Sequence, residues 1–71
     1  MIDATPNREG WFLARHTWET CEMYPVEVVQ TPLYLRAVPR QPGQPQHMFP
    51  LWRFTWGEEC GQPEGVSGWL S

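Results

Sequence analysis

Tryptophan content is the feature of this sequence that most constrains its fold. The chain has 71 residues and five of them are tryptophan. Each indole can bury roughly 150–250 Å², whereas a domain of this size buries only about 60% of the surface its unfolded chain exposes. We therefore expect a small folded domain with an aromatic core. The tryptophans are Trp11, Trp18, Trp52, Trp56 and Trp69.

Apolar residues alternate with the period of a β-strand in four segments, residues 11–18, 23–30, 33–38 and 48–56. No segment has the 3.6-residue periodicity and caps of a helix. Closely spaced strands are typical of an antiparallel meander, which must curl to bury aromatic side chains on both faces. We predict an all-β fold, either a small SH3-like barrel or a curled four- to five-stranded antiparallel meander.

The strand faces follow from the alternation. In the third segment Leu33, Leu35 and Ala37 would share a buried face, which leaves Tyr34 and Arg36 exposed on the other. Pro25 lacks an amide proton, so we expect it at a strand start or on a free edge.

The fourth segment would align Trp52, Phe54 and Trp56 on one face. These rings are expected to close the core, and the alternative is an exposed docking patch or a cage for a cationic ligand.

Two regions flank or interrupt this pattern. Residues 1–9 are predicted to be a flexible N-terminal arm, and residues 10–71 a single small β domain. Residues 39–47 form a loop in which Pro39, Pro42 and Pro45 recur every third residue, a spacing that a proline-recognition domain could also bind. The sequence predicts a turn-rich tail over residues 57–65 and a short closing strand or turn over residues 66–71.

Charge and composition limit the partners and the compartment. The net charge is −3 and all five cations are arginine, so generic nucleic-acid binding is disfavoured. Arginine makes bidentate contacts with carboxylates, which suits a protein partner. No apolar run approaches the length of a membrane span, and the first residues lack the pattern of a signal peptide. We expect a cytoplasmic protein without a membrane association.

The polar residues do not form a recognised reactive motif. His16, Cys21, His47 and Cys60 are zinc-ligand types, but their spacing lacks the usual close pairs, so no metal site is predicted. A bridge between Cys21 and Cys60 would close a loop of about 40 residues, and two reduced thiols are the alternative that a cytosolic protein favours. No catalytic signature is present, so we predict neither an enzyme nor a cofactor.

Several short motifs resemble those of short phage- and prophage-encoded proteins of uncharacterised function. The motifs are Gly10-Trp11-Phe12-Leu13-Ala14-Arg15, Trp18-Glu19, Pro25-Val26-Glu27-Val28-Val29, Leu33-Tyr34-Leu35-Arg36 and Phe49-Pro50-Leu51. The resemblance covers about residues 10–56. It implies a viral accessory protein that binds and modulates a host component, and it carries over no catalytic residue.

The leading functional hypothesis is a non-enzymatic module that binds a host protein. Its expected binding residues are Trp18, Tyr34, Arg36, Trp52, Trp56 and Trp69. One alternative is a single-stranded nucleic-acid binder that stacks bases on Trp52, Trp56 or Tyr34. Another is a structural subunit of a homo-oligomer or virion, because a small core gains stability from assembly.

Overall fold

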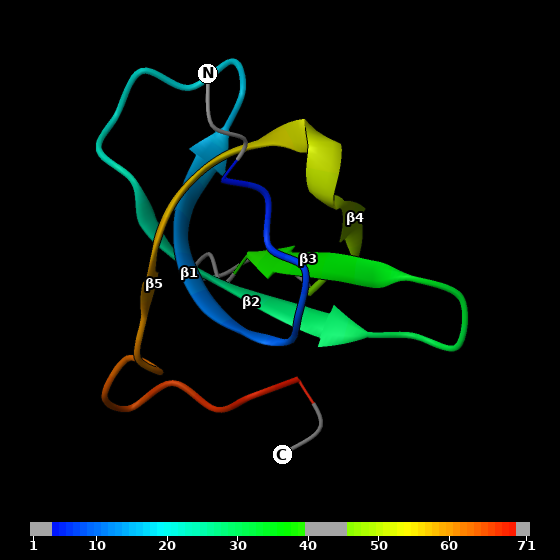
Figure 1. Cartoon of the computed structure of the whole chain (residues 1–71). Coiled ribbons are helices and arrows are strands. Elements are labelled where there is room, and N and C mark those ends of the chain that lie inside the picture. Colours follow the sequence, from blue (N-terminus) through cyan, green and yellow to red (C-terminus); the bar gives the residue numbers. More distant parts are fainter. Residues whose placement is uncertain (1–3, 40–45, 70–71) are drawn as a thin grey trace.

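Within the described residues, the fold consists of five β-strands and one short 3-10 helix (Figure 1). The structure is a computed structural model that describes residues 4–39 and 46–69. The elements are β1 (Gly10–His16), β2 (Tyr24–Gln30), β3 (Leu35–Pro39), β4 (Phe49–Pro50), η1 (Leu51–Arg53) and β5 (Phe54–Cys60).

The strands form one antiparallel sheet in the order β4-β3-β2-β1-β5. The chain meanders from β1 to β4 and then returns, so that β5 pairs with the free side of β1. The pairing of β1 with β5 shifts register between Phe12 and Ala14, an irregularity that increases bending. Both strands curve strongly around the rest of the sheet (Figure 1). The prediction of an all-β fold is confirmed, and the sheet agrees with the predicted curled meander of four to five antiparallel strands.

Aromatic contacts bring the two ends of the sheet together. β4 and β5 are the terminal strands of the order, yet the rings of Phe49 in β4 and Phe54 in β5 approach to 6.3 Å between centroids. η1 connects these two strands directly. The sheet therefore wraps around its own core in the manner of a small barrel, and the closer SH3-like description stays a prediction.

The core lies inside this curl and follows the alternation of the strands. The ring of Phe12 meets that of Trp56 edge to face, with centroids 6.3 Å apart at 89°, a geometry that aromatic pairs favour. Tyr24, Leu35, Phe49 and Leu51 pack around the margin. The buried cluster consists of Phe12, Ala14, Val26, Val28, Ala37, Phe54 and Trp56.

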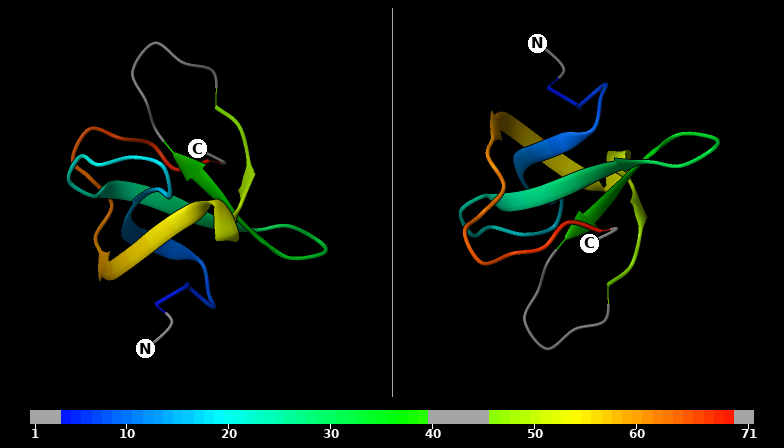
Figure 2. Two further views of the ribbon diagram at one scale, coloured as in Figure 1. Left: turned by 90° about the horizontal axis from the view of Figure 1, so that it is seen from above. Right: turned by 90° about the horizontal axis from the view of Figure 1, so that it is seen from below.

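A second set of buried residues lies on the outer face of the sheet. Trp11 and Val38 both stand opposite Glu27 in the pairing of β2 with its neighbours, so the three side chains share a face. The segment that follows β5 returns to this face, where the backbone N–H of Trp69 donates to Glu27 Oε1 at 2.8 Å. Figure 2 shows this segment, in red, running back alongside the β2–β3 region. Residues 66–69 form no strand.

The prediction of one strand over residues 48–56 is wrong. β4 ends at Pro50, η1 follows, and β5 continues to Cys60. The Leu51 carbonyl oxygen accepts hydrogen bonds from the Phe54 backbone N–H and from Trp56 Nε1, the latter at 2.9 Å. These bonds close a turn, so Trp52 does not share a face with Phe54 and Trp56.

The predicted start of the third strand is also wrong. β3 begins at Leu35, and Leu33 is 82% exposed in the preceding loop rather than aligned with Leu35. The Thr31 backbone N–H donates to the Tyr34 carbonyl oxygen at 3.0 Å. That bond closes a turn over the four residues and delays the strand.

Contacts hold the described part of the N-terminal arm against the sheet. Pro6 is buried, and Arg8 makes two hydrogen bonds to the Glu59 carboxylate at 2.5 and 2.9 Å. Glu9 Oε2 accepts the backbone N–H of Gln30 at 3.1 Å. The flexibility predicted for this arm stays a prediction. Residues 40–45 of the predicted proline loop lie outside the described residues.

Candidate binding groove

A hollow of about 730 Å³ opens on the surface where the β2–β3 loop, β3, β4 and η1 meet. Its size falls within the range of about 300–1,000 Å³ typical of ligand sites. We call it the aromatic groove. The described residues that line it are Thr5, Tyr34, Leu35, Arg36, Pro50, Leu51 and Trp52.

The β2–β3 loop holds Tyr34 at one side of the groove. The Thr31 hydroxyl donates to the Tyr34 carbonyl oxygen at 2.6 Å and accepts the Tyr34 N–H at 3.2 Å. These two side-chain hydrogen bonds close a turn as backbone hydrogen bonds do. It fixes the backbone of Tyr34 while the side chain stays 48% exposed.

Arg36 lies over the ring of Tyr34. Its guanidinium carbon is 4.1 Å from the ring centre, and Nη2 donates to the Tyr34 hydroxyl. A guanidinium stacked on an aromatic face keeps its planar donors directed outward along its edge. The pair therefore presents an ordered cation beside an apolar surface.

η1 presents Trp52 at the groove. Pro50 enters the turn in an extended conformation, and the two hydrogen bonds to the Leu51 carbonyl oxygen hold the turn against the core. The Trp52 side chain is 74% exposed as a result. Arg53 lies with its guanidinium carbon 5.5 Å from the Trp52 ring centre.

The described residues of the groove are cationic although the chain is acidic. Arg36 lines it, Arg53 lies beside Trp52, and none of the described lining residues is Asp or Glu. Apolar walls with a pre-ordered guanidinium suit an apolar segment that carries a carboxylate.

The structure brings together three of the six predicted binding residues, Tyr34, Arg36 and Trp52. Trp18 is 66% exposed and is not among the described lining residues; its ring stacks on His16 with centroids 4.2 Å apart. Trp56 is buried in the core, as the core interpretation of its segment predicted. Trp69 lines a different hollow.

The sequence interpretation did not identify Thr5, Leu35, Pro50 and Leu51 as groove residues. Pro50 offered the available signal, since a proline inside an apparent strand indicates an interruption. The other three carry no local feature that separates them from ordinary strand or arm residues.

His16 is a packing residue in this fold. It is buried between the rings of Trp18 and Phe54, with centroid distances of 4.2 and 4.3 Å, and its Nδ1 has no hydrogen-bond partner. Within residues 4–39 and 46–69, no three His, Cys, Asp or Glu side chains are grouped closely enough to hold a metal ion.

The two cysteines are separate free thiols. Cys60 stands opposite Trp11 at the start of β1, whereas Cys21 follows the other end of that strand. Burial raises the pKa of the Cys60 thiol, with a further contribution from Glu59. A raised pKa lowers the thiolate fraction and with it the reactivity.

Membrane insertion through a helix has no support in the described residues, because none of their helices combines the length and apolar character that a span requires.

Comparison with known proteins gives no family for this fold and groove. No family model, no curated protein and no solved structure matches the chain.

Proposed function

We propose that this protein is a protein-binding module whose aromatic groove holds a short apolar segment of a partner protein. The observation that carries the proposal is the convergence of an exposed Trp52, a half-exposed Tyr34 and Arg36 on one hollow. Tryptophan, tyrosine and arginine are the residue types most enriched among interface hot spots. Their grouping favours binding over a purely structural role.

The charge of the groove specifies the partner segment further. Arg36 is ordered by its stacking on Tyr34, so little entropy is lost when its guanidinium engages a carboxylate. We therefore expect an extended segment with apolar residues for the Trp52 wall and an Asp or Glu for Arg36. The volume suits only a few residues of such a segment.

The resemblance to short phage-encoded proteins extends the proposal. On that basis the partner is a host protein in the host cytoplasm, and the module modulates it without catalysing a reaction.

Peptide selection tests the groove directly. A random peptide library is selected on the purified protein, with counter-selection on the Trp52→Ala variant. Enriched peptides should combine apolar and acidic residues and bind Trp52→Ala and Arg36→Gln at least about tenfold more weakly. The Trp18→Ala variant removes an exposed indole that is not among the described lining residues, so it should bind them as the wild type does.

Two results would contradict the proposal. One is the absence of any enriched peptide after counter-selection. The other is a set of peptides that bind Trp52→Ala as tightly as the wild type.

A second candidate is stacking of single-stranded nucleic acid on the same rings. Arg36 over Tyr34 and Arg53 beside Trp52 are the observation that favours it. The net charge of −3 opposes it. A fluorescence titration with oligonucleotides should give salt-dependent tryptophan quenching if this candidate is correct, and no quenching if the groove binds protein.

A further inference from the structure

The pairing of β3 with β4 ends at the aromatic groove. β3 has five residues and β4 has two, and the register of the described residues ends with Arg36 opposite Pro50. The same register would next set Leu35 opposite Leu51, but Leu51 belongs to η1. β4 therefore does not cover the edge of β3 at Leu35, which lines the groove.

The backbone groups of Leu35 face this uncovered edge. Along a strand inside an antiparallel sheet, successive residues direct their N–H and carbonyl groups alternately to one neighbouring strand and to the other. The Thr31 N–H donates to the Tyr34 carbonyl oxygen between the ends of β2 and β3. The backbone groups of Tyr34 and Arg36 therefore face β2, and those of Leu35 face the side of β4.

The acceptor that the ladder would supply to the Leu35 N–H is already engaged. It is the Leu51 carbonyl oxygen, which accepts the Phe54 backbone N–H and Trp56 Nε1. A carbonyl oxygen has two lone pairs, so these two donors use its capacity. The turn that presents Trp52 thus leaves the neighbouring Leu35 N–H for an acceptor outside the sheet.

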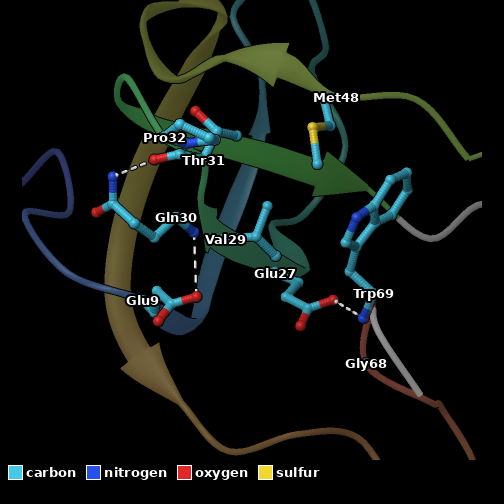
Figure 3. A pocket seen from close by; sticks show the side chains of 9 residues that line it. All are labelled: Glu9, Glu27, Val29, Gln30, Thr31, Pro32, Met48, Gly68 and Trp69. Carbon is cyan, nitrogen blue, oxygen red and sulfur yellow. Dashed lines mark hydrogen bonds between the residues drawn. The ribbon is translucent and has the colours of Figure 1, made fainter.

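The chain caps a comparable open edge of β2 with one of its own side chains. The pairing of β1 with β2 ends with Gly10 opposite Val28. Beyond it, the Gln30 N–H donates to Glu9 Oε2 at 3.1 Å beside a second hollow of about 470 Å³ (Figure 3). The described residues that line the aromatic groove include no carboxylate that could cap Leu35 in this way.

We propose that the partner segment enters the aromatic groove as an added strand, with one of its backbone carbonyl oxygens accepting the Leu35 N–H. This inference rests on the proposed function, because it requires that the groove bind an extended segment. Addition of a peptide strand to an exposed sheet edge is a common mode of recognition, in which backbone hydrogen bonds give affinity and side chains give specificity. The groove supplies that specificity through Trp52 and Arg36.

Strand geometry also places the acidic residue of the partner segment. Side chains that stand opposite each other in neighbouring strands share a face of the sheet. The segment residue that pairs with Leu35 is followed or preceded by a residue on the face of Tyr34 and Arg36. We therefore expect the Asp or Glu directly next to the residue whose carbonyl binds Leu35.

Hydrogen exchange in the free protein tests the open edge without a peptide. Exchange of the backbone amides with deuterium is followed by nuclear magnetic resonance and corrected for intrinsic rates. The Leu35 N–H should exchange at least about tenfold faster than that of Ala37, which faces the same side of β3 and pairs with Phe49. Equal protection of Leu35 and Ala37 would overturn the proposal, because the edge would then be closed.

The same measurement with a bound peptide tests the added strand. The probe is the tightest-binding peptide from the library selection whose affinity falls with Trp52→Ala. At saturation it should slow exchange of the Leu35 N–H at least about fivefold. The Gln30 N–H, which is already bonded to Glu9, is the control for general stabilisation and should change less. Equal slowing of the two amides would overturn the proposal.

A backbone substitution removes the donor itself. The 71-residue chain is synthesised with an ester in place of the amide of Leu35, which replaces the N–H by an oxygen and keeps the side chain. Peptide affinity should fall at least about threefold, as expected for the loss of one hydrogen bond. The control has the same ester at Leu33, which is not among the described lining residues, and it should bind as the wild type does.

The outcomes separate the added strand from the proposed function. A peptide that depends on Trp52 but neither protects the Leu35 N–H nor loses affinity with the Leu35 ester overturns the added strand and leaves the groove as a protein-binding site. The absence of any peptide that depends on Trp52 contradicts the proposed function, and the added strand with it.

Discussion

Glu19 organises the turn between β1 and β2 through a single carboxylate oxygen. Its Oε1 accepts the His16 backbone N–H and the Tyr24 hydroxyl, each at 2.6 Å. The hydrogen bond from Tyr24 is the main reason that the pKa of Glu19 lies below its ordinary value of 4.5. Burial, followed by the same hydrogen bond, raises the pKa of Tyr24 above its ordinary value of 10.0.

These opposite shifts define a pH window for the contribution of the pair to stability. A lowered carboxyl pKa stabilises the fold above pH 4.5, and that stability is lost as the pH falls through the lower folded-state value. A raised tyrosine pKa stabilises the fold below pH 10.0, and that stability is lost as the pH rises above it. The full contribution is present between these limits.

Replacing Glu19 should remove the part of this stability that depends on its ionised carboxylate. Glu19→Gln should lower the free energy of unfolding by about 1 kcal/mol at pH 7, because a charge-assisted hydrogen bond on a half-buried group is weakened. The difference from the wild type should shrink as the pH falls below 4.5. Urea unfolding at pH 7 and pH 3 checks this, and an equal difference at both values would contradict it.

At the scale of elements, η1 depends on one carbonyl oxygen. Trp56→Phe keeps an aromatic ring in the core but removes the Nε1 donor to the Leu51 carbonyl. We expect a loss of about 1–2 kcal/mol in the free energy of unfolding and weaker binding of groove peptides. Urea unfolding and peptide titration measure the two effects, with Trp18→Phe as the control outside the core. Unchanged stability and binding would show that Leu51 needs no indole donor.

A change in the β2–β3 loop should lower the peptide affinity of the groove with less effect on the core. Thr31→Val keeps the shape of the side chain and removes both hydrogen bonds between its hydroxyl and Tyr34. We expect a loss of about 1 kcal/mol in stability and a several-fold loss in peptide affinity, since Tyr34 is no longer fixed. Thr55→Val, an exposed position on β5, is the matched control. Equal effects of the two substitutions on affinity would contradict this role.

The strands were predictable where the alternation of apolar residues and the positions of turn-forming residues indicated the same strand boundaries. β2 lies within the predicted segment 23–30, and β1 overlaps the predicted segment 11–18 but begins one residue earlier, at Gly10. Pro25 is the second residue of β2 and pairs with Leu13, which agrees with the expectation of a position near the start of the strand. Residues 51–56 alternate equally well, yet η1 interrupts them. Its hydrogen bonds involve the Trp56 side chain, whose position depends on the folded core.

At the scale of the whole molecule, local sequence patterns predicted some residues of the binding surfaces, whereas contacts between distant parts of the chain determined others. Tyr34 and Arg36 were predicted as exposed companions on one strand face; the groove contains both, but Tyr34 lies in the loop before β3 and Arg36 is half-buried. Trp69 was expected at a surface, but its contact with Glu27 spans 42 positions. A contact between residues so far apart in the sequence depends on the path of the chain after β5, and no local sequence pattern encodes that path.

The whole molecule should not depend on a disulfide for stability. Cys60 pairs with Trp11 while Cys21 lies past the far end of β1, a strand of seven residues. At about 3.3 Å per residue, that separation exceeds the reach of a disulfide, whose Cα atoms lie within about 7 Å. The melting temperature should be the same with and without reductant, and a fall on reduction would contradict the arrangement of the ends of β1.

The central claim is that the aromatic groove binds a partner protein, and affinity capture with matched variants tests it most directly. Tagged wild type, Trp52→Ala and Trp18→Ala are incubated with nuclease-treated host extract, and captured proteins are quantified by mass spectrometry. Our account predicts one protein captured in stoichiometric amount by the wild type and Trp18→Ala and lost with Trp52→Ala. Equal capture by all three variants, or no captured protein, would contradict it.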